Sequence, residues 1–459
     1  MRKSLSKETT NPLSESVSEH DQRMRWWREA RFGMFIHWSV GVSLGSYWKG
    51  KPTNFCSEWI RHTGRISHAD YHELARNFNP RRYDAADWVA IARQAGMKYM
   101  VFTAKHHDGF CFWDSDQTDF KITRTATKRD LMRELTDECK RQSMPLGWYY
   151  SPRDWDHADY LPHYSQLPKQ GTRYKSWWGY LANPYTGTVA DGECGCATCR
   201  ANIPVVEERD PAKADLSRYL LFMRRQLEEL MTRYGPAAAM WFDAQEHPPA
   251  VGGTSELLAM MRRLNPDVII NDRVATVPEL GDFSVHEWDI PRERCVRDWE
   301  SCLCVNGSWA FNAFDLGWKP ASQLIRELCD IVSRGGNLLL NVGPDPDGVI
   351  PPACVERLQE MGRWLSINGD AIYGSQAGAW ESAGSLRFTR KGETHYVITT
   401  EWPGQMLSLP DIHLNPDAKV TLLGVDTLLR CEPGPNGSVI HLPAVRPCDH
   451  AWVFKVLPR

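Results

Sequence analysis

The chain of 459 residues has no run of 18 apolar residues, so no membrane-spanning helix is predicted. Its first 19 residues are polar and rich in serine and threonine, without the apolar segment of a secretory signal. We therefore expect no membrane partner. We also expect a cytoplasmic location, or a secreted or periplasmic one if a signal has been removed.

An excess of one charge sign is also missing, as is a disulfide pattern. The net charge is only −3, so no nucleic acid partner is expected. The 13 cysteines are odd in number and scattered, which favours a reducing compartment. One cluster, Cys194, Cys196 and Cys199, lacks paired C-x-x-C halves, yet it could hold a structural metal or form a local disulfide. It lies within residues 156–211, which we interpret as an inserted loop.

Several apolar runs end in residues that can hydrogen-bond or carry charge. His106 and His107 follow the apolar run 99–104, and His37 follows the run 33–36. Other runs end at Tyr149-Tyr150, at Asp243 and at Asn271-Asp272-Arg273. Such runs are typical of buried parallel strands, and ligands bind at the carboxyl ends of those strands. One shared pocket is therefore predicted.

The intervals between these runs have helical patterns. Apolar residues recur at spacings of three and four from Leu216 to Met231, and Gly235-Pro236 predicts the end of that helix. Shorter helices are predicted over residues 85–95, 129–141, 255–264 and 321–334. No G-x-G-x-x-G loop follows the first strand, which argues against a doubly wound sheet. We therefore predict an α/β fold with a (β/α)8-like, TIM-type catalytic barrel.

Near the carboxyl terminus the pattern changes to short β-rich runs. Residues 385–389, 395–400, 419–423 and 451–456 are separated by turn sequences, which predicts a small antiparallel β-sandwich. The expected domains are a polar N-terminal segment (1–22), the catalytic domain (23–360) and the sandwich (361–459).

The chain holds 20 tryptophans, and several stand near the predicted strand ends. Aromatic faces stack on the apolar faces of sugar rings, while histidine, tyrosine, arginine and carboxylate side chains can bind hydroxyl groups. The residues therefore favour a carbohydrate ligand.

Six motifs, in order from about residue 23 to 349, resemble the α-L-fucosidases of glycoside hydrolase family 29. They are Phe35-Ile36-His37-Trp38, Ser57-Glu58-Trp59, Lys105-His106-His107-Asp108-Gly109-Phe110, Gly147-Trp148-Tyr149-Tyr150-Ser151, Trp241-Phe242-Asp243 and the run from Val332 to Pro344. The resemblance implies a retaining exo-glycosidase that removes terminal α-L-fucose through a covalent intermediate. It also implies that the enzyme needs no metal and no organic cofactor.

The resemblance also assigns roles to residues. Asp243 matches the nucleophile, and an aspartate that ends a buried strand suits this role because pocket donors can keep it ionised. Glu287 matches a general acid/base, although His286 and Val285 depart from the related segment. Glu300 is the competitor for this role, and Glu246, Glu279 and Glu293 are weaker candidates. The predicted substrate-binding residues are His37, Glu58, Trp59, His106, His107, Tyr149, Trp241, Arg273 and Trp309.

We therefore expect an α-L-fucosidase that acts on fucosylated oligosaccharides or glycoconjugates, while self-association into a homo-oligomer stays open. One alternative is a glycosidase of the same fold that acts on a modified fucoside or on another sugar. A non-catalytic fucose-binding protein is an alternative from a different class, but it should have lost Asp243 or its acid partner.

Overall fold

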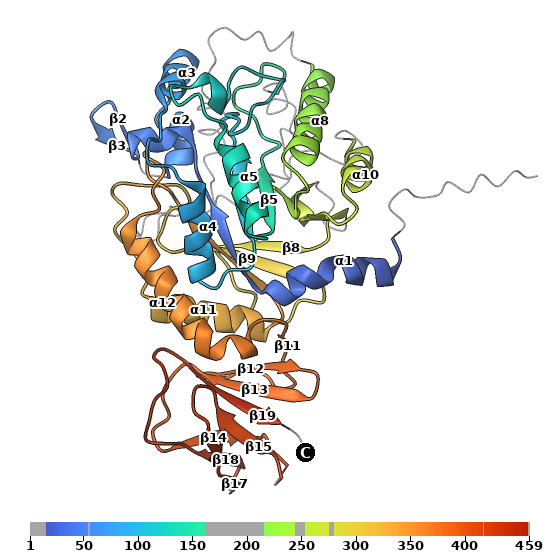
Figure 1. Ribbon diagram of the computed structural model, residues 1–459, viewed down its shortest axis with the longest axis vertical. Helices are drawn as coiled ribbons and strands as arrows, with labels where there is room; N and C mark the ends of the chain where they lie inside the picture. The colour runs from blue at the N-terminus through green and yellow to red at the C-terminus, as the bar shows by residue number, and fades with distance from the viewer. Residues whose placement is uncertain are drawn as a thin grey trace, which may run out of the picture.

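The computed structural model describes residues 15–53, 56–160, 215–243, 253–274, 280–415 and 417–457. Eight parallel strands form one sheet in the order β7-β6-β5-β4-β1-β10-β9-β8 (Figure 1). These strands are β1 (Phe32–Ile36), β4 (Met100–Lys105), β5 (Leu146–Tyr150), β6 (Ala239–Phe242), β7 (Ile269–Ile270), β8 (Ser284–Glu287), β9 (Trp299–Cys304) and β10 (Asn337–Val342). The predicted fold class is confirmed.

The two ends of this sheet meet between β7 and β8. A single bridge joins Asn271, which follows β7, to Phe283, which precedes β8. Two backbone hydrogen bonds support it: the Asp282 amide donates to the Ile270 carbonyl at 2.6 Å, and the Asp272 amide donates to the Phe283 carbonyl at 2.9 Å. In the described residues, the barrel is thus closed between β7 and β8 by one bridge and not by a continuous ladder.

Helices cover the outside of the barrel. The long ones are α3 (His68–Asn77), α4 (Ala85–Gln94), α5 (Leu131–Arg141), α8 (Leu216–Arg233), α10 (Thr254–Leu264), α11 (Ala321–Ser333) and α12 (Pro352–Asn368). Each predicted helix corresponds to one of these, with ends within two residues for the four shorter ones. Between β7 and β9, however, the described residues hold no α-helix, so the barrel is (β/α)8-like and not a regular repeat.

Short elements also lie between the strands. The connection from β1 to β4 carries η1 (Val40–Leu44), the hairpin of β2 (Tyr47–Trp48) and β3 (Lys51–Pro52), η2 (Ser57–Trp59) and α2 (Ile60–Thr63). The others are η3 (Ile122–Arg124), η6 (Asp272–Val274) and η8 (Gly369–Ala371). Of these, η2 and η6 matter for the pocket because they carry predicted site residues.

Helix α1 (Val17–Ala30) packs against the amino end of the barrel. The Asn337 side-chain amide donates to the Trp27 carbonyl at 2.7 Å, and the Trp27 ring lies 4.7 Å from that of Phe283. Inward-facing residues such as Phe35, Val101 and Leu339 fill the barrel above it. The amino end is therefore closed by packing, and the carboxyl ends are left for a pocket.

The C-terminal region consists of two antiparallel sheets that lie beyond α11 and α12 in Figure 1, as predicted. One sheet has six strands in the order β11-β12-β13-β19-β15-β16, and the other has three in the order β14-β18-β17. Apolar side chains of both sheets, including Phe388, Leu409, Ile440 and Phe454, form one core. The strands are β11 (Gln376–Ala377), β12 (Leu386–Lys391), β13 (Thr394–Thr399), β14 (Met406–Pro410), β15 (Lys419–Leu422), β16 (Leu428–Leu429), β17 (Cys431–Gly434), β18 (Gly437–His441) and β19 (Trp452–Leu457).

The predicted domain bounds stay a prediction. Helix α1 extends across residue 22, and α12 extends across residue 360, so both bounds would divide a continuous helix. The insertion at 156–211, including Cys194, Cys196 and Cys199, lies almost entirely outside the described residues. Within the described ranges all ten cysteines are free, and no helix is both long and apolar enough to cross a membrane.

Candidate active site

The carboxyl ends of the barrel strands bring the predicted site residues together. His37 directly follows β1, His106 and His107 follow β4, and Asp243 follows β6. Arg273 lies in η6, directly after β7, and Glu287 is the last residue of β8. Five separate strand ends therefore supply side chains to one pocket, as the polar residues after each apolar run predicted.

Asp243 is surrounded by hydrogen-bond donors. The Tyr149 hydroxyl donates to its Oδ2 at 2.7 Å, and Arg273 Nη1 donates to its Oδ1 at 2.9 Å. His107 Nε2 lies 3.6 Å from Oδ2. Donors of this kind stabilise a carboxylate in its ionised form, and the side chain keeps 22% of its surface exposed. Asp243 is thus held as an accessible anion, which is the state that a nucleophile requires.

Glu287 shares the guanidinium of Arg273 with Asp243. Arg273 Nη2 donates to Glu287 Oε2 at 2.9 Å, so one cation separates the two carboxylates. Burial raises the pKa of Glu287 and the charge of Asp243 raises it further, although Arg273 acts in the opposite direction. A carboxyl group whose pKa is raised beside an ionised carboxylate can act as a general acid.

The three histidines of the pocket are neutral near pH 7. Burial lowers the pKa of His37 to about 4, and it lowers the pKa values of His106 and His107 well below their ordinary value. His37 Nδ1 pairs with Asn341 Oδ1 at 2.7 Å, and His107 Nδ1 pairs with Ser151 Oγ at 2.6 Å. The buried His106 Nδ1 has no hydrogen-bond partner. Neutral imidazoles both donate and accept hydrogen bonds, which suits sugar hydroxyl groups.

Glu58 forms another wall of the pocket. It lies in η2 and is buried, and its Oε2 accepts a hydrogen bond from the Ala310 amide at 3.1 Å. Its Oε1 is buried without a partner. Burial raises the pKa of Glu58 to about 7, so it is largely protonated below neutral pH. An unpaired polar atom in such a place is costly unless a ligand pairs with it.

Aromatic rings complete the pocket. The Trp309 ring lies 4.9 Å from that of His37 and 4.8 Å from that of Trp288, the residue that follows Glu287. The Trp59 ring meets that of His107 edge-on at 5.1 Å. Trp241 stacks against Tyr149 at 5.5 Å and is buried. Inside the barrel, Trp241 contacts Phe35, Tyr149 and Glu300.

Glu300, the predicted competitor of Glu287, lies at the opposite end of the barrel. It is the second residue of β9, and its carboxylate accepts hydrogen bonds from Trp27, Tyr99 and Trp241. Trp299 belongs to a different cluster, because successive residues of a strand face opposite sides. Its place next to Trp299 in the sequence suggests that Glu300 packs around that ring, but the structure shows that it does not. Of the weaker candidates, Glu293 is exposed, whereas Glu246 and Glu279 lie outside the described residues.

Asn341 has a larger part in the pocket than the sequence suggested. The sequence run from Asn341 to Pro344 suggests only a structural role in closing the barrel, yet the Asn341 side chain joins two pocket residues. Its Oδ1 contacts His37, and its Nδ2 donates to the Trp309 carbonyl at 2.6 Å. The signal was present, because Asn341 follows the apolar run Leu338 to Leu340 just as His37 follows its own run.

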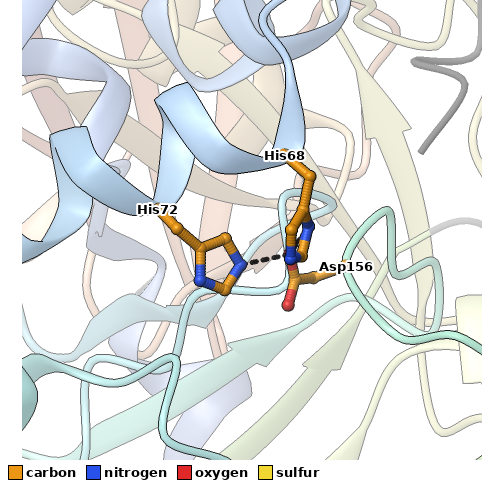
Figure 2. Close-up of side chains that lie close together, drawn as sticks. All are labelled: His68, His72 and Asp156. Atoms are coloured by element: carbon orange, nitrogen blue, oxygen red, sulfur yellow. Dashed lines mark hydrogen bonds and ion pairs between the residues drawn. The ribbon is translucent and has the colours of Figure 1, made fainter. Parts of the chain in front are cut away.

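Two groups of side chains outside the pocket offer metal-ligand atoms among the described residues. One of them, Glu15, His20 and Asp282, is already bound by the guanidinium groups of Arg23 and Arg262. In the other group, His68 and His72, four residues apart on α3, face Asp156, as Figure 2 shows. His72 Nε2 lies 2.8 Å and His68 Nδ1 3.2 Å from Asp156 Oδ1. The buried Arg61, however, places Nη1 3.0 Å from the same oxygen and Nη2 3.2 Å from His68 Nδ1. A dication would have to displace this guanidinium and leave its charge buried, so the group fits an ion-pair network and not a metal centre.

Chelation is therefore expected to leave activity unchanged. The pocket histidines contact Asn341, Ser151 and aromatic rings. Outside the pocket, the Arg61 guanidinium binds both Asp156 and His68. The measurement is the rate of fucoside hydrolysis before and after exhaustive dialysis against EDTA. Loss of activity that a single divalent ion restores would contradict this prediction.

A barrel with two carboxylates at the carboxyl ends of its strands, lined with neutral histidines and aromatic rings, is the architecture of a glycoside hydrolase. Comparisons with known proteins identify the family. The α-L-fucosidase family profile matches residues 1–370. The chain belongs to the α-L-fucosidase family.

Named relatives and solved structures agree with this family. Tissue α-L-fucosidase of Bos taurus is 29% identical, over 94% of this chain and 88% of the relative. The structure of α-L-fucosidase isoenzyme 1 from Paenibacillus thiaminolyticus is 31% identical with a TM-score of 0.77, over 96% of this chain and 99% of that chain. The α-fucosidase of Thermotoga maritima in complex with a mechanism-based inhibitor is 26% identical with a TM-score of 0.75, over 98% and 100%.

Proposed function

We propose that the protein is a retaining, exo-acting α-L-fucosidase in which Asp243 is the nucleophile and Glu287 the general acid/base. The observation that carries this proposal is that Asp243 and Glu287 each accept a hydrogen bond from a different terminal nitrogen of the Arg273 guanidinium. Two carboxyl groups that share one guanidinium can act on the same glycosidic bond, one as the nucleophile and the other as the general acid/base. Relatives that bear the name α-L-fucosidase support the same reaction.

The reaction then has two steps. In the first, an Asp243 oxygen attacks the anomeric carbon while the bond to the leaving oxygen breaks, and Glu287 gives its proton to that oxygen. In the second, ionised Glu287 takes a proton from water, the water oxygen attacks the anomeric carbon, and the bond to Asp243 breaks. The raised pKa of Glu287 suits its first role, and the loss of negative charge on Asp243 in the intermediate suits its second.

Substrate recognition is assigned to the remaining pocket residues. His37, His106, His107 and Glu58 face the pocket with neutral imidazoles and a mostly protonated carboxyl, so they can pair with fucose hydroxyl groups. Trp59 and Trp309 offer aromatic faces to the apolar side of the sugar ring. The substrate is a terminal α-L-fucose on an oligosaccharide or glycoconjugate. A cytoplasmic location and self-association stay predictions.

Retention of configuration tests this proposal. Proton NMR of the first minutes of hydrolysis of an aryl α-L-fucoside is expected to show α-L-fucose before mutarotation produces the β anomer. The reason is that two successive inversions at the anomeric carbon restore the starting configuration. If β-L-fucose formed first, the covalent role of Asp243 would be excluded.

A further inference from the structure

Glu300 is a buried carboxyl group that the proposed reaction does not use. Only 1% of its surface is exposed, and it lies at the amino end of β9, inside the barrel. Its Oε2 accepts hydrogen bonds from the Tyr99 hydroxyl at 2.5 Å and from Trp27 Nε1 at 3.3 Å, while its Oε1 accepts one from Trp241 Nε1 at 3.0 Å. All three donors are neutral. Burial raises the pKa of Glu300 to about 7, which shows that keeping this group inside the barrel is costly.

The single partner of Oε1 connects Glu300 to the pocket. Trp241 lies on β6, two residues before Asp243, and its ring stacks against Tyr149 at 5.5 Å. The Arg273 guanidinium lies over the same ring, 5.1 Å from its centre. Tyr149 and Arg273 both donate hydrogen bonds to Asp243. One indole ring therefore contacts both donors.

We propose that Glu300 is a positioning residue for the nucleophile: its Oε1 fixes the orientation of the Trp241 indole, and the indole holds Tyr149 and Arg273 in place against Asp243. This inference depends on the proposed role of Asp243. The hydrogen bond from its N–H to Glu300 sets the rotation of the indole, because the contacts of the ring with Phe35, Tyr149 and the Arg273 guanidinium do not involve the N–H. Without Glu300 as acceptor, the buried Trp241 N–H is left unpaired, which is energetically costly and favours other orientations of the indole.

Two substitutions of similar size separate this role from others. Glu300→Leu removes the acceptor and leaves the Trp241 N–H unpaired. We expect the rate constant of the first chemical step to fall about 10- to 100-fold, since small displacements of a reacting group cost that much, while the dissociation constant for fucose changes little. Glu300→Gln keeps a carbonyl oxygen for Trp241 and can donate its amide N–H to the Tyr99 hydroxyl. It is expected to stay close to wild type.

Trp241→Phe tests the same hydrogen bond from its other end, and it serves also if Glu300→Leu does not fold. Its effect on the first step should match that of Glu300→Leu, and the double variant should be no slower than either single one. Trp27→Phe is the matched control, because it removes an indole donor from the other oxygen of Glu300. That variant is expected to lower the melting temperature without changing the first-step rate constant.

The outcomes are distinct. Wild-type kinetics in Glu300→Leu and Trp241→Phe, with only the melting temperature lowered, would overturn the positioning role. An inactive Glu300→Gln whose activity azide restores would instead make Glu300 the acid/base. If Asp243→Gly kept its activity, the proposed function itself would fail, whatever the Glu300 variants show.

Discussion

Replacing Asp243 with glycine is expected to lower turnover by about 10⁴-fold or more, because removal of a covalent nucleophile leaves only binding and charge stabilisation. Fucose binding should change far less, since His37, His106 and His107 belong to other strand ends, and His37 and His107 keep their hydrogen bonds to Asn341 and Ser151. Steady-state kinetics with an aryl fucoside measures the first quantity, and titration calorimetry with L-fucose measures the second.

Two further variants control this experiment. Asp243→Asn keeps the shape of the side chain and is expected to be as inactive as Asp243→Gly. Asp87→Asn makes the same carboxyl-to-amide change on an exposed position of α4 and should behave as wild type. Turnover near the wild-type rate in either Asp243 variant would move the nucleophile to another residue.

The second large effect is expected for Glu287→Ala. A natural oligosaccharide has a poor leaving group that must be protonated, so its hydrolysis should slow by about 10²- to 10⁴-fold. An aryl fucoside with an acidic phenol leaves without protonation and should keep its first step. Azide can enter the space left by the side chain and attack the intermediate without a general base. Added azide is therefore expected to restore turnover of the aryl fucoside.

Glu300→Ala provides the comparison. It should slow both substrates to a similar extent, without rescue by azide, because Glu300 acts on the orientation of Asp243 and not on the leaving group. If Glu300→Ala showed the substrate-selective, azide-rescued pattern and Glu287→Ala did not, Glu300 would be the acid/base.

The pH dependence of Glu287 follows from the direction of its pKa. The first step requires the protonated carboxyl, and burial together with Asp243 raises its pKa above the ordinary value of a glutamate. Hydrolysis of an oligosaccharide should therefore decline as the pH rises through that raised pKa. Glu287→Ala should lack this decline.

The sequence predicted the five barrel strands β1, β4, β5, β6 and β7 and the polar residues at their ends, because both depend on local patterns. An apolar run followed by His37 or Asp243 needs no knowledge of distant contacts. The sandwich strands β12, β13, β15 and β19 were predicted for the same reason, whereas the polar, partly exposed β17 was not. Helix α1 was also missed, since its strongly polar sequence becomes interpretable only through what Trp27 contacts.

The parts of the site that could not be predicted depend on which side chains meet across the barrel. Nothing in the segment around Glu300 shows that its oxygens face Trp27, Tyr99 and Trp241 from three other elements. Asn341 was assigned to barrel closure for the same reason, although its partners His37 and Trp309 come from elsewhere. Sequence patterns indicate which face a residue occupies, but not its partners there.

The residues around the junction of β7 and β8 both close the barrel and carry part of the proposed catalytic site. One bridge, between Asn271 and Phe283, and a few hydrogen bonds around it join the two strands in the described residues. Arg273 and Glu287 lie on opposite sides of this junction and are hydrogen-bonded to each other. The ion pair of Arg273 and Glu287 therefore also links β7 to β8 where few backbone hydrogen bonds connect the two strands. A fluctuation that separates β7 from β8 also separates Glu287 from Arg273, the cation that it shares with Asp243. Hydrogen exchange of the backbone amides near Ile270 and Phe283 therefore reports both on the stability of this junction and on the integrity of the site.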